Sequence, residues 1–355
     1  MRASGSTRKL RTAATIWMLA TVAVALPFSA QTKKRAPQKK SAALAAPIKI
    51  ACGSAAELRL SAANSAQGTL LVAELRGPQP LADVSGTWDE KAVPFWQETP
   101  AAAKAAKSPD IHRAFLGIDL EKPAGTYDFN ASAKTAASEE ITCKAPVTVK
   151  AGKFATEHLK VAPNFVEPNP EQLAKAQEDS KRLRELYATI TPEKLWQGKF
   201  RIPLDGVSTG GNFGRRRILN GKSSSPHTGV DMPALTGTPV HASQRGRVVL
   251  ADELYFSGNT VLIDHGLGVY TLYGHFSETD VKPGDLVEAG TVIGKVGATG
   301  RVTGPHLHWG LTVDRARVNA LSIVAASSKE SLANSRIQFG RSLISYLLFS
   351  GLGRK

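Results

Sequence analysis

The sequence predicts a mainly β protein, with two β-domains joined by one helix. Short runs of β-type residues recur along most of the chain, and glycine, proline, asparagine and aspartate separate them. One stretch, from about residue 170 to 190, has its apolar residues at helical spacing instead. The length of 355 residues fits two or three domains, and a hydrophobic content of 42% is ample for their cores.

The N-terminal residues are typical of an export signal. A basic start precedes an uncharged run from Thr12 to Thr32, whose most apolar part is Ile16 to Leu26. That part is shorter than the roughly 20 residues of a spanning helix, which favours a cleaved signal at residues 1–30. The alternative is an uncleaved anchor at residues 12–32, which the basic linker at residues 31–47 favours slightly. Both place the protein in the periplasm or cell envelope.

The formal net charge of +15 does not indicate nucleic-acid binding, because the charge lies at the two ends of the chain. Residues 1–40 carry nine Lys or Arg and no acid, and residues 329–355 carry a net +4, which leaves +2 for everything between. A nearly neutral body offers no basic face for phosphates. We therefore expect no nucleic-acid partner.

The pattern of residues 48–165 predicts an accessory domain that resembles a small antiparallel β-sandwich. Its expected strands are Ile48–Ala51, Glu57–Leu60, Thr69–Leu75, Ala114–Asp119, Thr126–Phe129 and Ile141–Val149. Cys52 and Cys143 belong to the first and last of them, so we expect one disulfide in an exported chain, with two buried thiols as the alternative. His112 and His158 are isolated, so this domain is expected to be a spacer or a binding module.

Residues 166–199 form a connecting segment that contains the predicted helix. Asn169 is a typical N-cap, Pro170 suits the first turn, and Gln172 stands three residues after the cap. Thr191-Pro192 ends the helical pattern.

Residues 200–322 are predicted to form the second β-domain. Its expected strands are Val240–Ala242, Gly246–Ala251, Thr260–Asp264, Val269–Tyr273, Leu286–Val287, Thr291–Val296 and His306–Val313. Glycine turns separate these runs, and little helix is evident.

Five polar side chains of this domain carry the strongest chemical signal. His306 and His308 point to the same face of their strand, because alternate strand residues share a face. Upstream lie His227 and Asp231, with His275 between the two pairs. Imidazole and carboxylate are ordinary Zn²⁺ ligands, and a catalytic site uses three of them plus a water. The alternatives are a satisfied polar cluster and a structural zinc site. The latter is disfavoured because such sites mostly use cysteine, and neither cysteine lies here.

These motifs resemble the lysostaphin/LytM-type zinc metallopeptidases, which cut peptidoglycan peptides. The resemblance rests on His-x-x-x-Asp at His227, Tyr-Gly-His ending at His275, and His-x-His at His306, and it covers about residues 200–321. Together with the strand pattern, it implies an open antiparallel β-sheet with a groove across it. Asn212 is inserted in a Gly-Phe-Gly-like turn where some relatives carry an inhibitory asparagine, a role that one residue does not transfer.

The resemblance also implies a role for each motif residue. His227, Asp231 and His308 would bind one Zn²⁺ per chain, while His275 and His306 would line the cavity and take the proton of the attacking water. Histidine is a credible base, with an ordinary pKa of about 6.5, and no His-Glu-x-x-His motif supplies a glutamate.

The implied function is zinc-dependent hydrolysis of stem peptides or peptide cross-links of peptidoglycan. A D-alanyl–diaminopimelate cross-link is expected rather than a glycine bridge. One alternative is a non-catalytic LytM-type regulator that activates cell-wall amidases, a class marked by lost metal ligands, whereas every motif position is filled here. Another is a carrier whose accessory domain binds the wall or a partner.

Three further features have no assigned function in the sequence. His241 and His265 are expected to be structural, and Tyr273 is either a hydrogen-bonding neighbour of the site or a core residue. In the tail at residues 323–355, the apolar run at residues 343–349 is too short to span a bilayer. That run could be a membrane contact, a docking strand or an unstructured extension. The oligomeric state has no signal in the sequence.

Overall fold

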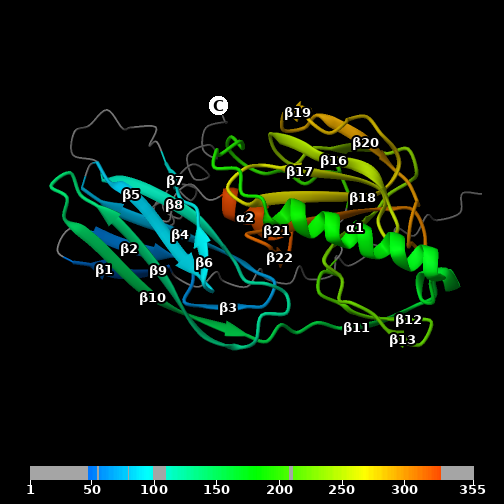
Figure 1. Cartoon of the computed structure of the whole chain (residues 1–355), viewed down its shortest axis with the longest axis horizontal. Coiled ribbons are helices and arrows are strands. Elements are labelled where there is room, and N and C mark those ends of the chain that lie inside the picture. The colour runs from blue at the N-terminus through cyan, green and yellow to red at the C-terminus, as the bar shows by residue number, and fades with distance from the viewer. Residues whose placement is uncertain (1–46, 54–55, 79, 99–108, 208–210, 329–355) are drawn as a thin grey trace, which may run out of the picture. The chain divides into compact units, whose positions relative to one another are not determined.

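The computed structural model describes residues 47–328, apart from 54–55, 79, 99–108 and 208–210 (Figure 1). Strands are the main regular structure of the described residues, which also contain two α-helices and one short 3₁₀ helix at Pro163–Phe165, and this confirms the mainly β class. The signal or anchor, nearly all of the basic linker, and the tail beyond residue 328 lie outside the described residues. Neither described α-helix has the length and apolarity that crossing a bilayer requires.

Two five-stranded sheets build the accessory region (Figure 1). The first has the order β1-β2-β4-β8-β7 and consists of β1 (Ile48–Cys52), β2 (Ala56–Leu60), β4 (Leu70–Gly77), β8 (Asp110–Gly117) and β7 (Trp96–Gln97). The second has the order β3-β10-β9-β5-β6 and consists of β3 (Asn64–Ala66), β10 (Glu140–Lys150), β9 (Gly125–Lys134), β5 (Ala82–Trp88) and β6 (Lys91–Val93). Buried side chains from both sheets share one core. One detail of the prediction is wrong: β3 pairs with β10 in parallel, so the region is not wholly antiparallel.

A disulfide joins Cys52 of β1 to Cys143 of β10, with 5.1 Å between their Cα atoms. The predicted bridge is therefore present, and the two-thiol alternative is wrong. Because β1 and β10 belong to different sheets, the bridge ties the two layers of the sandwich together.

Helix α1 (Pro170–Ala188) begins as predicted. Asn169 Oδ1 accepts a hydrogen bond from the backbone N of Gln172, and Gln172 Oε1 accepts one from the backbone N of Asn169. This reciprocal capping box satisfies two donors that a helix start otherwise leaves unpaired. The apolar face of the helix, including Leu183 and Leu186, packs on β16 (Gly246–Leu254) and β17 (Gly258–Asp264) of the second β-region.

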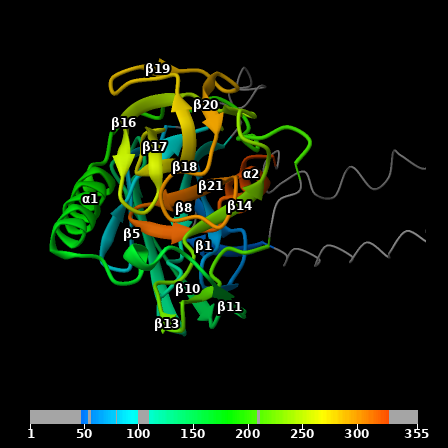
Figure 2. The ribbon, with the colours of Figure 1, turned by 90° about the vertical axis from the view of Figure 1, so that its right-hand side faces the viewer.

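The second β-region contains one open, antiparallel nine-stranded sheet, as predicted. Its main path consists of β14 (Gly229–Pro233), β21 (His306–Val313), β18 (Val269–Thr279), β17 (Gly258–Asp264), β16 (Gly246–Leu254) and β19 (Leu286–Val287). Off this path lie β15 (Pro239–His241), β20 (Val292–Val296) and β22 (Ala316–Val318), and a short helix, α2 (Leu321–Ser328), follows. Figure 2 shows β14 and β18 on either side of β21, the pairing that positions the polar residues described below.

A small third sheet was not predicted. In it β11 (Thr156–Leu159) pairs in parallel with β12 (Arg216–Leu219), which pairs with β13 (Lys222–Ser223). The chain leaving the accessory region thus forms a sheet with the strand just before His227.

The accessory region packs directly on the second β-region, because the described residues belong to one compact unit. The rings of Trp96 and Phe115 lie 5.2 and 5.8 Å from that of Trp196, measured between centroids. Arg317 donates two hydrogen bonds to the carboxylate of Asp119, at 3.0 and 2.7 Å. The domain boundaries inferred from the sequence stay predictions.

Candidate metal centre

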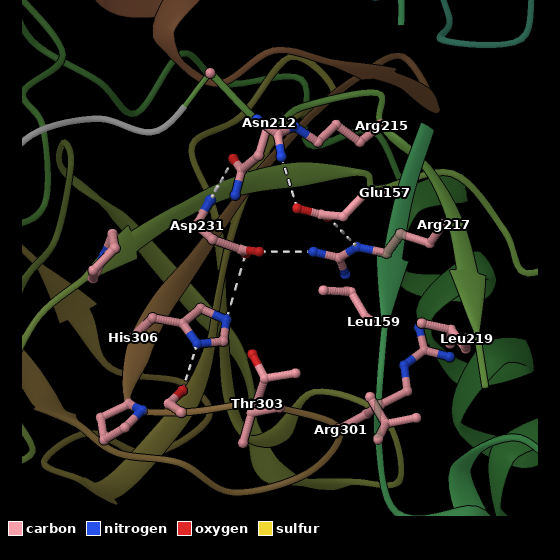
Figure 3. Close-up of a pocket in the computed structure, with 16 residues that line it drawn as sticks. Glu157, Leu159, Asn212, Arg215, Arg217, Leu219, Asp231, Arg301, Thr303 and His306 are labelled. Carbon is pink, nitrogen blue, oxygen red and sulfur yellow. Dashed lines mark hydrogen bonds and ion pairs between the residues drawn. The ribbon is translucent and has the colours of Figure 1, made fainter. Parts of the chain in front are cut away.

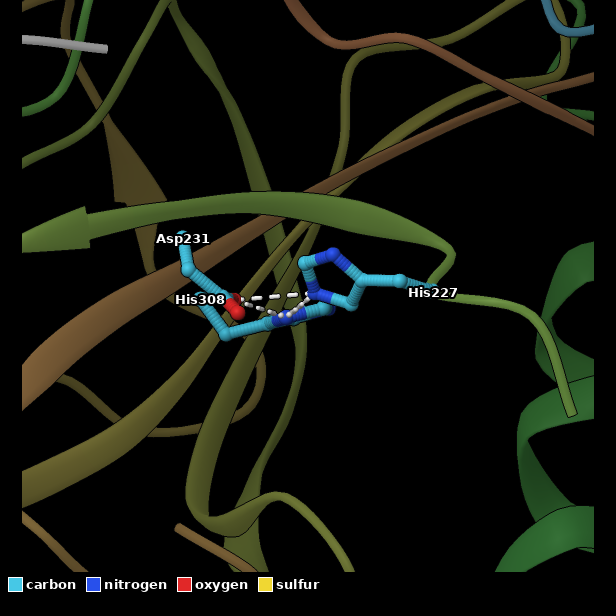
Figure 4. A group of neighbouring side chains, drawn as sticks. All are labelled: His227, Asp231 and His308. Carbon is cyan, nitrogen blue, oxygen red and sulfur yellow. Dashed lines mark hydrogen bonds and ion pairs between the residues drawn. The ribbon is translucent and has the colours of Figure 1, made fainter. Parts of the chain in front are cut away.

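Three side chains meet on one face of the β14–β21 pair. Asp231 stands directly opposite His308 in the register of these strands, and His227 lies just before β14 (Figure 4). His227 Nε2 is 2.9 Å from Asp231 Oδ1 and 3.0 Å from His308 Nδ1, and His308 Nδ1 is 2.9 Å from Asp231 Oδ1. The antiparallel register therefore brings together the three residues that the sequence resemblance assigned to zinc.

These three atoms suit a metal ion. The ring Nδ1 of His227 donates to the backbone oxygen of Asn212 at 2.9 Å, which leaves Nε2 with its lone pair toward the other two groups. Electron-rich atoms this close repel one another unless a proton or a cation lies between them. Two imidazoles and one carboxylate are an ordinary catalytic zinc set, with a position left for water or substrate.

The pKa shifts of Asp231 and His308 favour the protonation states that bind metal. Burial alone would raise the pKa of Asp231, but the close contacts with the rings of His227 and His308 outweigh it and hold that pKa below its usual value. Burial lowers the pKa of His308. An ionised carboxylate and a neutral imidazole are the forms that metal binding requires.

Asn212 braces two of the three ligands without belonging to the group. Its backbone oxygen holds His227, and its side-chain oxygen accepts a hydrogen bond from the backbone N of Asp231 at 3.0 Å. The inserted asparagine is thus explained as a support for the ligands, a role that the sequence pattern did not reveal. Partners of this kind fix the orientation of metal ligands.

His275 and His306 lie at the edge of the group, as the sequence resemblance implied. Their ring centroids are 4.7 Å apart, and each Nδ1 is 2.8 Å from a backbone oxygen, that of Thr299 for His275 and that of Gly304 for His306. Each Nε2 is therefore left as the proton-accepting atom, and that of His306 lies 3.6 Å from Asp231 Oδ1. Burial lowers the pKa of His275 to about 3.

The backbone of His275 is strained, with φ of +68°, in the left-handed region that non-glycine residues rarely adopt. Its backbone N donates to the oxygen of Ser257 at 2.7 Å, which helps to hold this conformation. Strain of this kind concentrates at functional sites, where surrounding contacts offset its cost.

An ion-pair chain reaches the metal centre from the third sheet (Figure 3). Arg217 Nη2 donates to the second oxygen of Asp231, Oδ2, at 2.8 Å. Glu157 in β11 lies 3.6 Å from Arg217 Nε and accepts from Arg215 Nη1 at 2.7 Å. Sequence reasoning missed these three residues. Alternation along a strand could have placed Arg215 and Arg217 on one face, but nothing in the sequence indicated the pairing of β11 with β12.

A cavity of about 350 Å³ opens beside Asp231 and His306 (Figure 3). Residues 157–161 and strand β12 contribute to its lining, and so does the loop at residues 301–305 that leads into β21. The groove that the resemblance implied is thus present as a pocket next to the candidate ligands.

The two other histidines of this β-region and Tyr273 have structural partners. His265 is fully buried, with ring nitrogens 2.9 Å from the oxygen of Arg245 and 2.7 Å from Thr271 Oγ1. His241 Nδ1 lies 2.9 Å from the oxygen of Gly290. Tyr273 is a core residue whose hydroxyl accepts from the backbone N of Ser243 at 2.8 Å.

Gly229 makes room for the ring of His308, so Gly229→Ala should weaken metal binding. A Cβ at this position would lie 2.6 Å from two ring atoms of His308 and 2.8 Å from the backbone oxygen of Trp309. We expect a loss of metal affinity of at least tenfold, the order seen when ligand orientation is disturbed. Metal content after dialysis against graded chelator measures it. Gly304→Ala is the matched control, because a Cβ there meets nothing within 4 Å; equal affinities in the two variants would contradict the prediction.

The comparisons with known proteins agree with this geometry. Residues 225–320 match the model of Peptidase family M23. The chain is 43% identical over 146 residues to the peptidoglycan DD-endopeptidase ShyA of Vibrio cholerae, which covers 40% of this chain and 34% of that protein. It is 45% identical over 97 residues to the DD-carboxypeptidase/endopeptidase Mpg of Neisseria meningitidis, which covers 27% of this chain and 22% of that protein. The matched part of the chain thus spans 34% or less of the length of these relatives.

One solved structure resembles both β-regions. It is a Pseudomonas aeruginosa protein described as a candidate M23 peptidase, and it matches with a TM-score of 0.52 and 27% identity over 72% of this chain and 93% of that one. All five motif residues fall within the matched family region, and a member of this peptidase family is expected to hold a metal. The resemblance seen in the sequence is therefore confirmed: residues 225–320 carry a domain of Peptidase family M23, the lysostaphin/LytM-type metallopeptidases.

Proposed function

We propose that the protein is a zinc metalloendopeptidase that hydrolyses peptide cross-links or stem peptides of bacterial peptidoglycan. The observation that carries the proposal is the complete triangle of His227 Nε2, Asp231 Oδ1 and His308 Nδ1, with edges of 2.9 to 3.0 Å. Two further histidines stand at its edge, and a cavity opens beside it.

His227, Asp231 and His308 would hold one zinc ion per chain. An ion held there would supply Lewis-acid chemistry, polarising the scissile carbonyl and making water a nucleophile near neutral pH. Arg217 and Asn212 keep Asp231 in position through its second oxygen and its backbone N.

His306 and His275 would manage protons. Each ring has its Nδ1 turned to a backbone oxygen, so each Nε2 is free to accept a proton from the attacking water and to return it to the leaving amine. Burial disfavours a charge on His275, so that ring suits the role of a neutral acceptor that orients the attacking water through Nε2. We assign the main proton transfer to His306, whose Nε2 lies 3.6 Å from Asp231 Oδ1.

The substrate and the compartment rest on the relatives and on the sequence. ShyA is named a peptidoglycan DD-endopeptidase, and such a substrate lies outside the cytoplasm. The basic, then apolar, N-terminal pattern agrees with export to the periplasm or cell envelope.

Metal content and release of muropeptides from intact peptidoglycan test the proposal. Purified protein is expected to carry one zinc per chain and to generate new free peptide ends, and a chelator should remove both the zinc and the activity. Bound zinc without cleavage would contradict the enzymatic assignment. The absence of both would instead favour the amidase-activating regulator, which addition of a purified amidase would then test.

A further inference from the structure

The cavity beside the candidate metal centre carries more positive than negative side chains. Three arginines line it, against two carboxylates; they are Arg215, Arg217, Arg301, Glu157 and Asp231. Glu157 is shared by Arg215 and Arg217, and Asp231 is held by Arg217 and by the two ligand histidines. Both carboxylates are therefore committed to other groups.

Arg301 is the lining arginine that neither of these two carboxylates contacts. Within the described residues its guanidinium has no carboxylate partner and no hydrogen bond, and its charge lies over the ring of Phe256, 4.5 Å from the ring centroid. Its backbone N also donates to the backbone oxygen of Phe256 at 2.9 Å, which fixes the backbone from which the side chain extends. Burial and the nearby Arg217 lower the pKa of Arg301 to about 10, which shows how poorly the protein alone compensates this charge.

The position of Arg301 suits a substrate group rather than a structural contact. Figure 3 shows His306 and Arg301 on different sides of the cavity, with the ion pair of Asp231 and Arg217 along the side above them. A planar guanidinium with free N–H groups binds a carboxylate through two parallel hydrogen bonds, which no neutral group reproduces.

We propose that Arg301 binds a free carboxylate of the substrate, on the residue that supplies the amine of the scissile bond. This inference rests on the proposed endopeptidase function. In a peptide bond formed by an α-carboxyl group, that carboxyl group of the first residue is consumed by the bond itself. The nearest free α-carboxylate therefore belongs to the residue on the amine side, when that residue is terminal or is linked through its side chain. The substrate class is thus a peptide whose leaving residue carries an uncapped α-carboxylate.

Two matched peptides test this proposal on the full-length protein. One ends in D-Ala-D-Ala with a free carboxylate, and the other is the same peptide as its C-terminal amide. The protein is expected to cleave the carboxylate form about 10- to 100-fold more efficiently, the range of one charge-assisted hydrogen-bonded contact. Arg301→Gln should remove this preference by slowing cleavage of the carboxylate form alone, and Arg301→Lys should retain part of it. Arg216→Gln, an exposed arginine of β12 that does not line the cavity, is the control and should behave like the wild type.

Calorimetric binding of the same two peptides to metal-free protein separates this inference from the proposed function. Tighter binding of the carboxylate peptide, lost in Arg301→Gln, supports the subsite even if neither peptide is cleaved. Equal binding and equal cleavage of the two peptides by the wild type would overturn the subsite and leave the endopeptidase assignment standing. A normal rate of Arg301→Gln on the amide peptide, or its normal circular dichroism, shows that the variant folds.

Discussion

Replacing His308 with alanine should abolish zinc binding and lower peptidoglycan hydrolysis by about three orders of magnitude or more. The ring supplies one corner of the ligand triangle, and a metal ion contributes several kcal/mol of charge stabilisation to such a reaction. Metal analysis of the purified variant, together with muropeptide release, measures both effects.

The neighbouring substitution His306→Ala should separate the two effects. Its Nε2 lies at the edge of the group, 3.6 Å from Asp231 Oδ1, so the variant should keep its zinc while hydrolysis falls by about 10²- to 10⁴-fold, the usual contribution of a positioned proton acceptor. His241→Ala is the control, since that ring bonds to the backbone oxygen of Gly290 and does not line the cavity. Equal zinc loss in the His306 and His308 variants would show that the division into ligand and proton-transfer roles is wrong.

Removal of the Cys52–Cys143 bridge should produce the largest loss of stability. The two cysteines are 91 residues apart, and a cross-link over a loop of that length disfavours the unfolded chain strongly. We expect the Cys52→Ser, Cys143→Ser double variant to lose about 2–5 kcal/mol of unfolding free energy. Urea denaturation of the oxidised wild type and of the double variant measures the difference.

A reductant provides the internal control for that experiment. It should lower the stability of the wild type toward that of the double variant and leave the double variant unchanged. Zinc content should stay the same at low denaturant, because the bridge belongs to the core of the accessory region and the metal ligands lie in the second β-region. An unchanged midpoint of unfolding after reduction would mean that the bridge contributes nothing to stability.

Much of the fold follows from local sequence signals. The capping box at Asn169 and Gln172 set the start of α1, and β19 and β21 lie at the predicted residues. The alternation of His306 and His308 in β21 was readable because strand geometry fixes which residues share a face. The pairing of two cysteines in an exported chain was readable for a chemical reason, since export places thiols in an oxidising compartment.

The features that the sequence did not reveal depend on contacts between distant segments. Strand β14 was missed although it carries Asp231, because Gly229 and Pro233 at its ends weaken the strand pattern. The support that Asn212 gives to His227 and Asp231, and the link from Glu157 to Arg217, join residues far apart in the chain. No local propensity encodes such partners.

Because β11 pairs in parallel with β12, two separate stretches of sequence build the candidate metal centre and the cavity beside it. The candidate ligands all come from residues 227–308, within the family region, whereas one wall of the adjoining cavity comes from residues 157–161, well upstream of it. Substitutions in that upstream segment can change what the cavity admits while the hydrolytic apparatus stays intact. Transplanting the family region alone into another protein would therefore transfer the chemistry with only part of its selectivity.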